Sequence, residues 1–179
     1  MLLRVLVVIA VLIAGVFIFA STKPETFTIQ RATTIAAPPA KIFALLNDFH
    51  NWSRWEPQDK EDPTIKRTFS GSSSGEGAVS DWSGSGTTGT GQMTITKSVP
   101  STNIAIMVHW VKPFQAYNLN VFTLEPQGAT TRVTWAMQGT NVYIMKLMSL
   151  FMNMDRFMGR HFETGLANLK AAAERAEGN

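Results

Sequence analysis

The spacing of apolar residues changes near Tyr143, and this change constrains the fold more than any other feature of the sequence. Before it, short apolar segments alternate with the period of two that is typical of strands. After it no proline occurs, and apolar residues recur with the 3.6-residue period of a helix. We therefore predict one continuous C-terminal helix of roughly 30 residues. Its apolar stripe comprises Ile144, Leu147, Phe151, Met154, Met158, Phe162, Leu166, Leu169 and Ala173.

Seven segments ahead of that helix are predicted to be strands. After the first strand, 27–35, come two short helical segments, one carrying Ile42 to Phe49 and the other Trp52 and Trp55. Because consecutive strands and one amphipathic helix leave few ways of packing, we predict an α+β fold. A curved antiparallel sheet would wrap around the long C-terminal helix. The later strands are 64–69, 78–82, 93–96, 104–110, 116–124 and 132–137.

Residues 70–91 are rich in glycine and serine, with seven of each among 22 positions. One interpretation is a flexible linker. The alternative is a pair of tight hairpins in a strongly curved sheet, where glycine supplies bulges and turns with positive φ. Val79 and Trp82 inside the segment, and the strand pattern directly after it, favour the hairpins.

The N-terminal segment, residues 1–22, is set apart from the domain that follows at 23–179. From Leu2 to Ala20 every residue is apolar except Arg4 and Gly15, and the stretch after Arg4 is about 24 Å long as a helix. An uncleaved membrane anchor, a cleaved signal peptide and a buried core helix all fit this length, and we favour the anchor. Arg4 predicts a cytoplasmic N-terminus, with the domain on the outer or periplasmic side. A cleaved segment would instead give a secreted protein.

Composition excludes several classes of function. Cysteine is absent, so disulfides, thiolate nucleophiles and Cys-ligated metals are excluded. The net charge is only +3 and no basic block occurs, which argues against a nucleic-acid partner. The three histidines lack the close spacing of metal ligands, and we expect neither a metal nor a cofactor. Literal matches to a dinucleotide fingerprint at 84–89 and to a nucleophile elbow at 71–75 are not followed by the helix that either motif requires.

Several short motifs resemble the START-like, Bet v 1-like (SRPBCC) superfamily, and within it the bacterial polyketide cyclase/dehydrase-type members. They are Ile35-Ala-Ala-Pro-Pro-Ala-Lys-Ile-Phe43 followed by Asn51-Trp-Ser-Arg-Trp-Glu-Pro57, then the segments 89–95, 112–114 and 130–135. The resemblance covers roughly residues 27–175. It implies a helix-grip fold with a hydrophobic cavity between the sheet and the C-terminal helix. Members bind or transport lipids, sterols and polyketides, and a minority catalyse cyclisations or dehydrations. The membrane segment departs from the soluble pattern of these members.

A cluster of methionines supports the expectation of a hydrophobic ligand, since six of the nine fall between 137 and 158. Methionine is flexible and fills irregular apolar space, although plain core packing explains the cluster as well. Apolar residues also lie off the helical stripe, which suggests a second contact with a membrane, a partner or a ligand. The residues predicted to line the cavity are Trp82, Met93, Ile95, Trp110, Phe114, Trp135, Met137, Phe151, Met154 and Met158.

Three hypotheses for function follow. The first is a membrane-tethered domain that binds, transports or sequesters a hydrophobic small molecule or lipid. The second is a cyclase or dehydratase that uses the same cavity, for which His50 with Asp48, Asp155 or Glu56 are weak catalytic candidates. For both residues we favour the simpler interpretation: His50 as a polar residue in the break between two helices, and Asp155 as a surface partner for a neighbouring arginine. The third is a non-catalytic envelope or stress protein acting through protein contacts of the Met-rich helix. An inward-facing carboxylate or imidazole would favour the enzyme.

Overall fold

Seven antiparallel strands form one curved sheet, in the order β1-β7-β6-β5-β4-β3-β2. The computed structural model describes residues 1–113, 115–141, 143–150 and 153–175. Every neighbouring pair of strands except β1 and β7 is consecutive in the chain. The sheet is therefore a meander from β2 to β7, with β1 added as the edge strand beside β7. The strands are β1 Thr26–Ile35, β2 Lys66–Gly71, β3 Ala78–Ser83, β4 Thr90–Val99, β5 Asn103–Lys112, β6 Ala116–Gln127 and β7 Thr130–Thr140.

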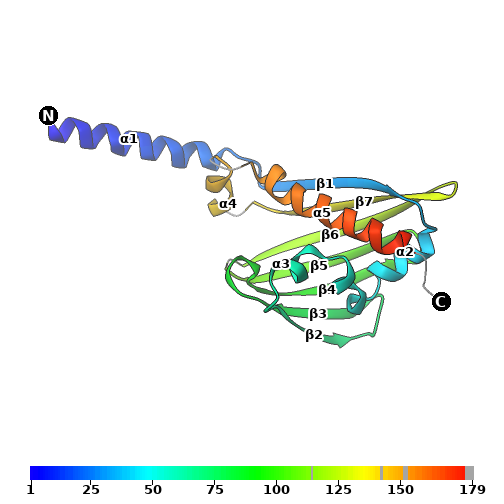
Figure 1. Ribbon diagram of the computed structural model, residues 1–179. Coiled ribbons are helices and arrows are strands. Elements are labelled where there is room, and N and C mark those ends of the chain that lie inside the picture. Colours follow the sequence, from blue (N-terminus) through cyan, green and yellow to red (C-terminus); the bar gives the residue numbers. More distant parts are fainter. Residues whose placement is uncertain (114, 142, 151–152, 176–179) are drawn as a thin grey trace.

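One long helix, α5, crosses the concave side of the sheet, and shorter helices lie on the same side (Figure 1). This is the predicted helix-grip arrangement, and the α+β fold is confirmed. The helical elements are α1 Leu2–Ser21, α2 Pro39–Leu46, the 3-10 helix η1 Phe49–Arg54, α3 Pro57–Glu61, the 3-10 turn η2 Gly86–Thr88, α4 Tyr143–Met148 and α5 Met154–Glu174.

Local sequence explains where these elements begin. Pro39 and Pro57 each occupy the first turn of a helix, where a missing N–H costs nothing. β7 alternates buried Thr131, Val133, Trp135 and Met137 with more exposed neighbours, as the period-two pattern predicted. In the segment rich in glycine and serine, Gly71, Gly75 and Gly77 take positive φ around the β2–β3 hairpin, and the hairpin prediction is confirmed.

The prediction of a single C-terminal helix was wrong. The chain forms α4, turns at Ser149 and Leu150, and starts again as α5. Asn153 caps the second helix, because its side-chain oxygen accepts a hydrogen bond from the Arg156 backbone N–H at 2.9 Å. The apolar stripe runs through this break, so periodicity alone did not reveal it. The second strand also starts two residues later than predicted, at Lys66.

The two ends of the sheet differ, and we name them by α5. At the proximal end β1 and α5 begin, and the register places Thr26 opposite Thr140 and Trp110 opposite Ala116. At the distal end β1 finishes with Ile35, and α5 finishes beside α2. Many of the fully buried side chains lie toward the distal end: Ile35, Ile42, Leu46, Ile95, Ile104, Leu124, Val133 and Leu169.

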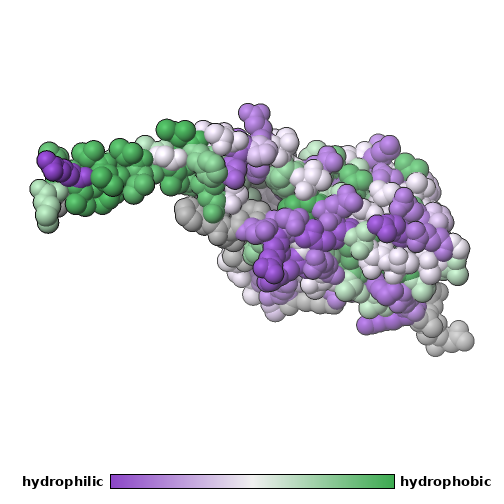
Figure 2. All heavy atoms as spheres, turned by 90° about the horizontal axis from the view of Figure 1, so that it is seen from above, coloured by the Kyte–Doolittle hydropathy of each residue, from purple (hydrophilic) through white to green (hydrophobic). Residues whose placement is uncertain are grey.

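Helix α1 leaves the proximal end and projects away from the sheet (Figure 1). Residues Leu3–Ser21 have a mean hydropathy of 2.9, and most of their side chains are exposed. In Figure 2 α1 is green along nearly all of its length, whereas the surface of the domain is largely purple and white. By length and composition α1 can cross a membrane, and a signal sequence would pass the same test. Of the three alternatives for this segment, the buried core helix does not fit, because most of its side chains are exposed.

Candidate functional site

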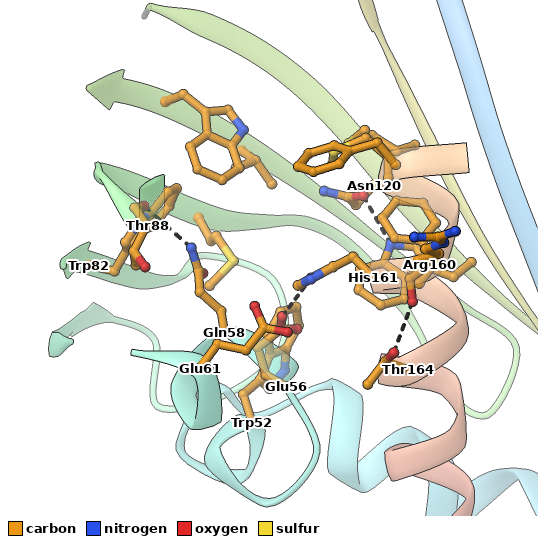
Figure 3. Close-up of a pocket in the computed structure, with 18 of the residues that line it drawn as sticks. Trp52, Glu56, Gln58, Glu61, Trp82, Thr88, Asn120, Arg160, His161 and Thr164 are labelled. Atoms are coloured by element: carbon orange, nitrogen blue, oxygen red, sulfur yellow. Dashed lines mark hydrogen bonds and ion pairs between the residues drawn. The ribbon is translucent and has the colours of Figure 1, made fainter. Parts of the chain in front are cut away.

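A cavity of about 430 Å³ lies between the proximal half of the sheet, α3 and the first half of α5 (Figure 3). This volume is within the range of small-molecule sites in proteins. The lining residues come from every layer of the domain: Trp52, Glu56, Gln58, Glu61, Arg67, Trp82, Thr88, Met93, Val108, Trp110, Asn120, Trp135, Met137, Phe157, Met158, Arg160, His161, Phe162 and Thr164.

The sheet provides an apolar wall built around tryptophans. Trp82 on β3 and Trp110 on β5 meet edge to face, with ring centroids 4.9 Å apart. Trp82 can lie flat along the sheet because its neighbour on β4 is Gly91, where a Cβ atom would clash with the indole ring. Farther along the wall, Trp135 stacks on Phe162 of α5 with a centroid distance of 4.2 Å. The wall is thus rigid and apolar.

Buried aromatic side chains also place the first polar group of the cavity. Trp52 and Trp55 are buried, and their indole N–H groups donate to the carbonyl oxygens of Leu46 and Leu45 at 3.0 and 3.3 Å. These bonds hold the short turn against α2. Glu56, the next residue, occupies the N-cap position of α3 and lines the cavity although its side chain is only 6% exposed.

Glu56 forms an ion pair with His161 of α5, at 3.0 Å between Oε1 and Nε2. Figure 3 shows the imidazole reaching from α5 toward the carboxylate. Burial by itself lowers the pKa of His161, but the hydrogen bond and the charge of Glu56 outweigh burial, so the pKa is raised above its usual value. The cavity therefore contains a carboxylate and an imidazole in direct contact.

Arg67 of β2 supplies a second charged group. Its side chain is 9% exposed and pairs with the buried carboxylate of Asp59, with 2.9 Å between Nε and Oδ1. Its Nη1 atom is buried and has no hydrogen-bond partner among the described residues. Arg67 thus adds a charged group to the lining of the cavity, with most of its guanidinium out of contact with the open space.

Asp62 fixes the loop at the edge of the cavity. Its carboxylate accepts from the Thr64 hydroxyl at 2.6 Å and from the Ser85 backbone N–H at 2.7 Å. These hydrogen bonds, led by the one from the Thr64 side chain, lower the pKa of Asp62 far below its usual value. The segment after α3 is thereby tied to the turn before Thr88, a residue of the cavity wall.

Six of the ten residues predicted to line the cavity do line it: Trp82, Met93, Trp110, Trp135, Met137 and Met158. Ile95 was misplaced, because it points into the packed core with no exposed surface. Phe114 and Phe151 lie outside the described residues, as does the side chain of Met154.

The predicted catalytic candidates separate into two groups. Glu56 lies in the cavity. His50 and Asp48 do pair, at 2.7 Å, but they lie at the surface, where the imidazole packs on Phe69. Asp155 also faces outward, and a hydrogen bond from Arg31 of β1 lowers its pKa instead of burial raising it.

Sequence reasoning missed His161 and Arg67. His161 was considered only as a metal ligand, and nothing in the sequence linked it to Glu56. Its position one turn from Phe157 and Met158, and next to Phe162, was the available signal, because a polar residue inside an apolar helical stripe faces the sheet. Among the described residues, no group of three or more His, Asp or Glu side chains could hold a metal ion.

One protein family and several solved structures resemble this chain. Residues 26–174 match the family model described as "Polyketide cyclase / dehydrase and lipid transport", which is most of the chain. No curated protein sequence matches.

Solved structures share the fold at low sequence identity. Protein CV1439 from Chromobacterium violaceum is 13% identical with a TM-score of 0.60, covering 86% of this chain and 100% of that one. The di-domain ARO/CYC StfQ from the steffimycin biosynthetic pathway is 11% identical with a TM-score of 0.61, covering 84% of this chain and 51% of StfQ. Ara h 8.0201 is 14% identical with a TM-score of 0.55, covering 83% and 97%.

Proposed function

Because the chain belongs to the polyketide cyclase/dehydrase and lipid transport family, we propose that its cavity binds a hydrophobic small molecule or a lipid. The observation that carries this proposal is the apolar wall of Trp82, Trp110 and Trp135 around about 430 Å³ of space. Burying about 300 Å² of apolar ligand surface would contribute about 7 kcal/mol before the costs of association.

The polar groups of the cavity would orient such a ligand. Arg67 lines one side of the cavity, and the Glu56–His161 pair lies on the helical side. A ligand with an apolar body and one hydrogen-bond acceptor satisfies both kinds of surface.

We also propose that α1 anchors the domain to a membrane, with the N-terminus cytoplasmic and the domain on the outer side. Support comes from the length and hydropathy of α1 and from Arg4 near its start. Lys23→Cys or Glu177→Cys, each unique in a chain without cysteine, should react with an impermeant reagent from the outer side only. Reaction from the cytoplasmic side alone would contradict this orientation, and release of the domain from membranes would indicate a cleaved signal.

Native mass spectrometry of the full chain, ejected from detergent micelles, tests the binding proposal. We expect an added mass on the folded chain, and extraction should identify it as a hydrophobic molecule. Trp82→Ala removes part of the apolar wall and should reduce the bound fraction. Phe69→Ala, at an exposed aromatic outside the cavity, is the matched control. A protein that carries no such mass, and takes up none from a lipid extract, would contradict the proposal.

One observation favours a second candidate function, which is proton transfer to the bound ligand. The Glu56–His161 pair lies in the cavity, and the raised pKa of His161 keeps more of the imidazole protonated near neutral pH. Such a group can donate a proton to a carbonyl or hydroxyl oxygen, the chemistry that dehydration and cyclisation require.

Substitution separates the two functions on one identified ligand. Under the catalytic hypothesis, Glu56→Gln and His161→Gln should retain binding but lower turnover by about a hundredfold or more. His50→Gln, which changes a surface imidazole, should leave turnover unchanged. Native turnover in both cavity variants would restrict the protein to binding.

A further inference from the structure

Helix α1 is held against the proximal end of the domain by specific contacts. The Asn141 side chain and backbone N–H donate to the carbonyl oxygens of Pro24 and Glu25, at 3.1 and 2.7 Å. The hydroxyl of Tyr143, in α4, donates to the Phe17 carbonyl oxygen at 2.9 Å, and the two rings stack. The direction of α1 is therefore fixed relative to the sheet near its last turn.

The cavity lies at this same end. Its strand residues Trp82, Trp110 and Met137 lie in the proximal halves of β3, β5 and β7. Its residues on α5 begin with Phe157 in the first turn of that helix, shortly after α4. Phe157 is 60% exposed although it lines the cavity, so it belongs to both the cavity and the outer surface.

Exposed apolar side chains gather at the proximal end. Four of them form what we call the proximal patch: Val111, Tyr117, Tyr143 and Phe157. Nearer the distal end, Val99 on β4 and Phe69 on β2 are exposed as well, and Met107 of β5 lies between the two ends. Tyrosine is enriched where proteins meet the headgroup region of a bilayer. Tyr143 lies beside Phe17, about one turn before the end of α1. With α1 spanning a bilayer, this position is at the depth of the headgroup region.

Charge at this end complements an anionic membrane. Three acidic side chains there already pair with basic ones: Glu56 with His161, Asp59 with Arg67 and Asp155 with Arg31. Among the described residues at this end, four further acidic side chains form no ion pair, Glu25, Glu61, Asp62 and Asp81, against six basic ones: Lys23, Lys66, Lys112, Lys146, Arg156 and Arg160. Juxtamembrane lysine and arginine are attracted to anionic lipid headgroups, and that attraction falls off within a Debye length.

From these placements we propose that the proximal patch rests on the surface of an anionic bilayer, so that the cavity exchanges its ligand directly with that bilayer. The proposal rests on the proposed function, because it needs α1 in a membrane and a hydrophobic ligand. It adds that the domain is seated on the membrane rather than suspended from it. The exposed ring of Phe157 would be the point at which lipid and cavity meet.

Two exposed valines at opposite ends of the sheet make a matched test. Val111 and Val99 are 41% and 37% exposed, and the natural chain has no cysteine. Val111→Cys, Phe157→Cys and Val99→Cys each receive one fluorescent label in the full chain, reconstituted into vesicles of phosphatidylcholine and phosphatidylglycerol that contain a nitroxide-headgroup lipid. We expect strong quenching at 111 and 157 and little at 99. Equal, weak quenching at all three positions would overturn the proposal.

A charge-reversed variant tests the choice of lipid. Lys112→Glu with Lys146→Glu should lose most of the quenching at position 111, whereas Lys97→Glu, at the distal half of β4, should not. Replacing phosphatidylglycerol by phosphatidylcholine should have the same effect as the double substitution. Full quenching in both cases would overturn the role of anionic headgroups.

Failure of this inference is distinguishable from failure of the proposed function. Native mass spectrometry of the same samples reports ligand binding independently of seating. Bound ligand without quenching at 111 leaves the proposed function standing and overturns the seating. Quenching at 111 without any bound ligand supports the seating and overturns the proposed function. Recovery of the chain in the supernatant of pelleted vesicles contradicts the membrane anchor.

Discussion

The distal and proximal ends of the domain are built from the same strands and the same helix, yet side chains fill only the distal end. There, branched aliphatic residues such as Ile104, Val133 and Leu169 interlock with no exposed surface. At the proximal end, Trp82 and Trp110 stand as walls around open space. One continuous fold can therefore have its tightly packed core at one end and its binding site at the other.

Helix α5 shows how the sequence produces this difference. Its second half presents Leu166, Leu169, Ala172 and Ala173, all of them buried. Its first half contains His161, which is polar and pairs across the cavity with Glu56. Small and branched apolar side chains allow close approach of helix and sheet, whereas at His161 the helix places a polar group toward Glu56, at the start of α3.

The largest expected effect comes from the distal end. Leu169→Ala should lower the free energy of unfolding by about 2–5 kcal/mol, because it leaves a cavity in a fully packed core. Affinity for a cavity ligand, measured below the unfolding transition, should stay within a factor of about two to three. Chemical denaturation gives the first quantity and a binding titration the second. If Leu169→Ala lost much of its ligand affinity but kept native stability, the distal end would contribute to binding rather than to stability, contrary to this account.

A smaller effect on stability is expected at the proximal end. Met158→Ala removes a half-buried side chain beside existing space, so the loss of stability should be below the range for packed sites. Ligand affinity should fall about tenfold, equivalent to about 1.4 kcal/mol. The same two measurements apply, with Leu169→Ala as the reciprocal control. If Met158→Ala destabilises the domain more than Leu169→Ala, the comparison fails.

The Glu56–His161 pair predicts how stability depends on pH. Because the folded pKa of His161 is raised, its contribution is fully present below the unfolded value of about 6.5 and is lost as pH rises through the folded pKa. His161→Gln should therefore reduce the difference in thermal midpoint between slightly acidic and alkaline buffer. His50→Gln is the surface control. An unchanged pH profile in the cavity variant would show that the pair is not charged in the folded state.

The smallest effect is expected from removing α1. Residues 1–22 pack chiefly on α4, and nearly all of the buried apolar side chains lie beyond them. The fragment 23–179 should remain soluble and unfold in one sharp transition, with a thermal midpoint close to that of the full chain. Calorimetry of the fragment measures this. An aggregated or broadly melting fragment would show that α1 belongs to the core.

Much of the fold could be predicted from the sequence because local periodicity determines it. The alternation in β7 and the stripe of α5 identify their buried faces without any tertiary information. The break after α4 was not predicted, because Asn153 acts through a capping hydrogen bond inside an uninterrupted apolar pattern. Apolar lining residues such as Met93 and Met137 could be predicted, since any inward residue of the proximal strands qualifies.

The polar part of the site could not be predicted, because it depends on long-range packing. Glu56 and His161 meet only when α3 and α5, about a hundred residues apart in the chain, pack against each other. The pair that is close in sequence, Asp48 and His50, forms its hydrogen bond locally and lies at the surface. Proximity in sequence favoured the wrong pair of residues.

The central claim is that the proximal end holds a hydrophobic molecule inside the domain, and fluorescence titration of the fragment 23–179 with 1-anilinonaphthalene-8-sulfonate tests it most directly. Val108 lines the cavity and is 4% exposed, whereas Val111 on the same strand lies at the surface. We predict saturable, blue-shifted emission with energy transfer from tryptophan, lost in Val108→Trp and retained in Val111→Trp at native thermal midpoints. Binding that is absent from the unaltered fragment, or unchanged in Val108→Trp, would contradict the claim.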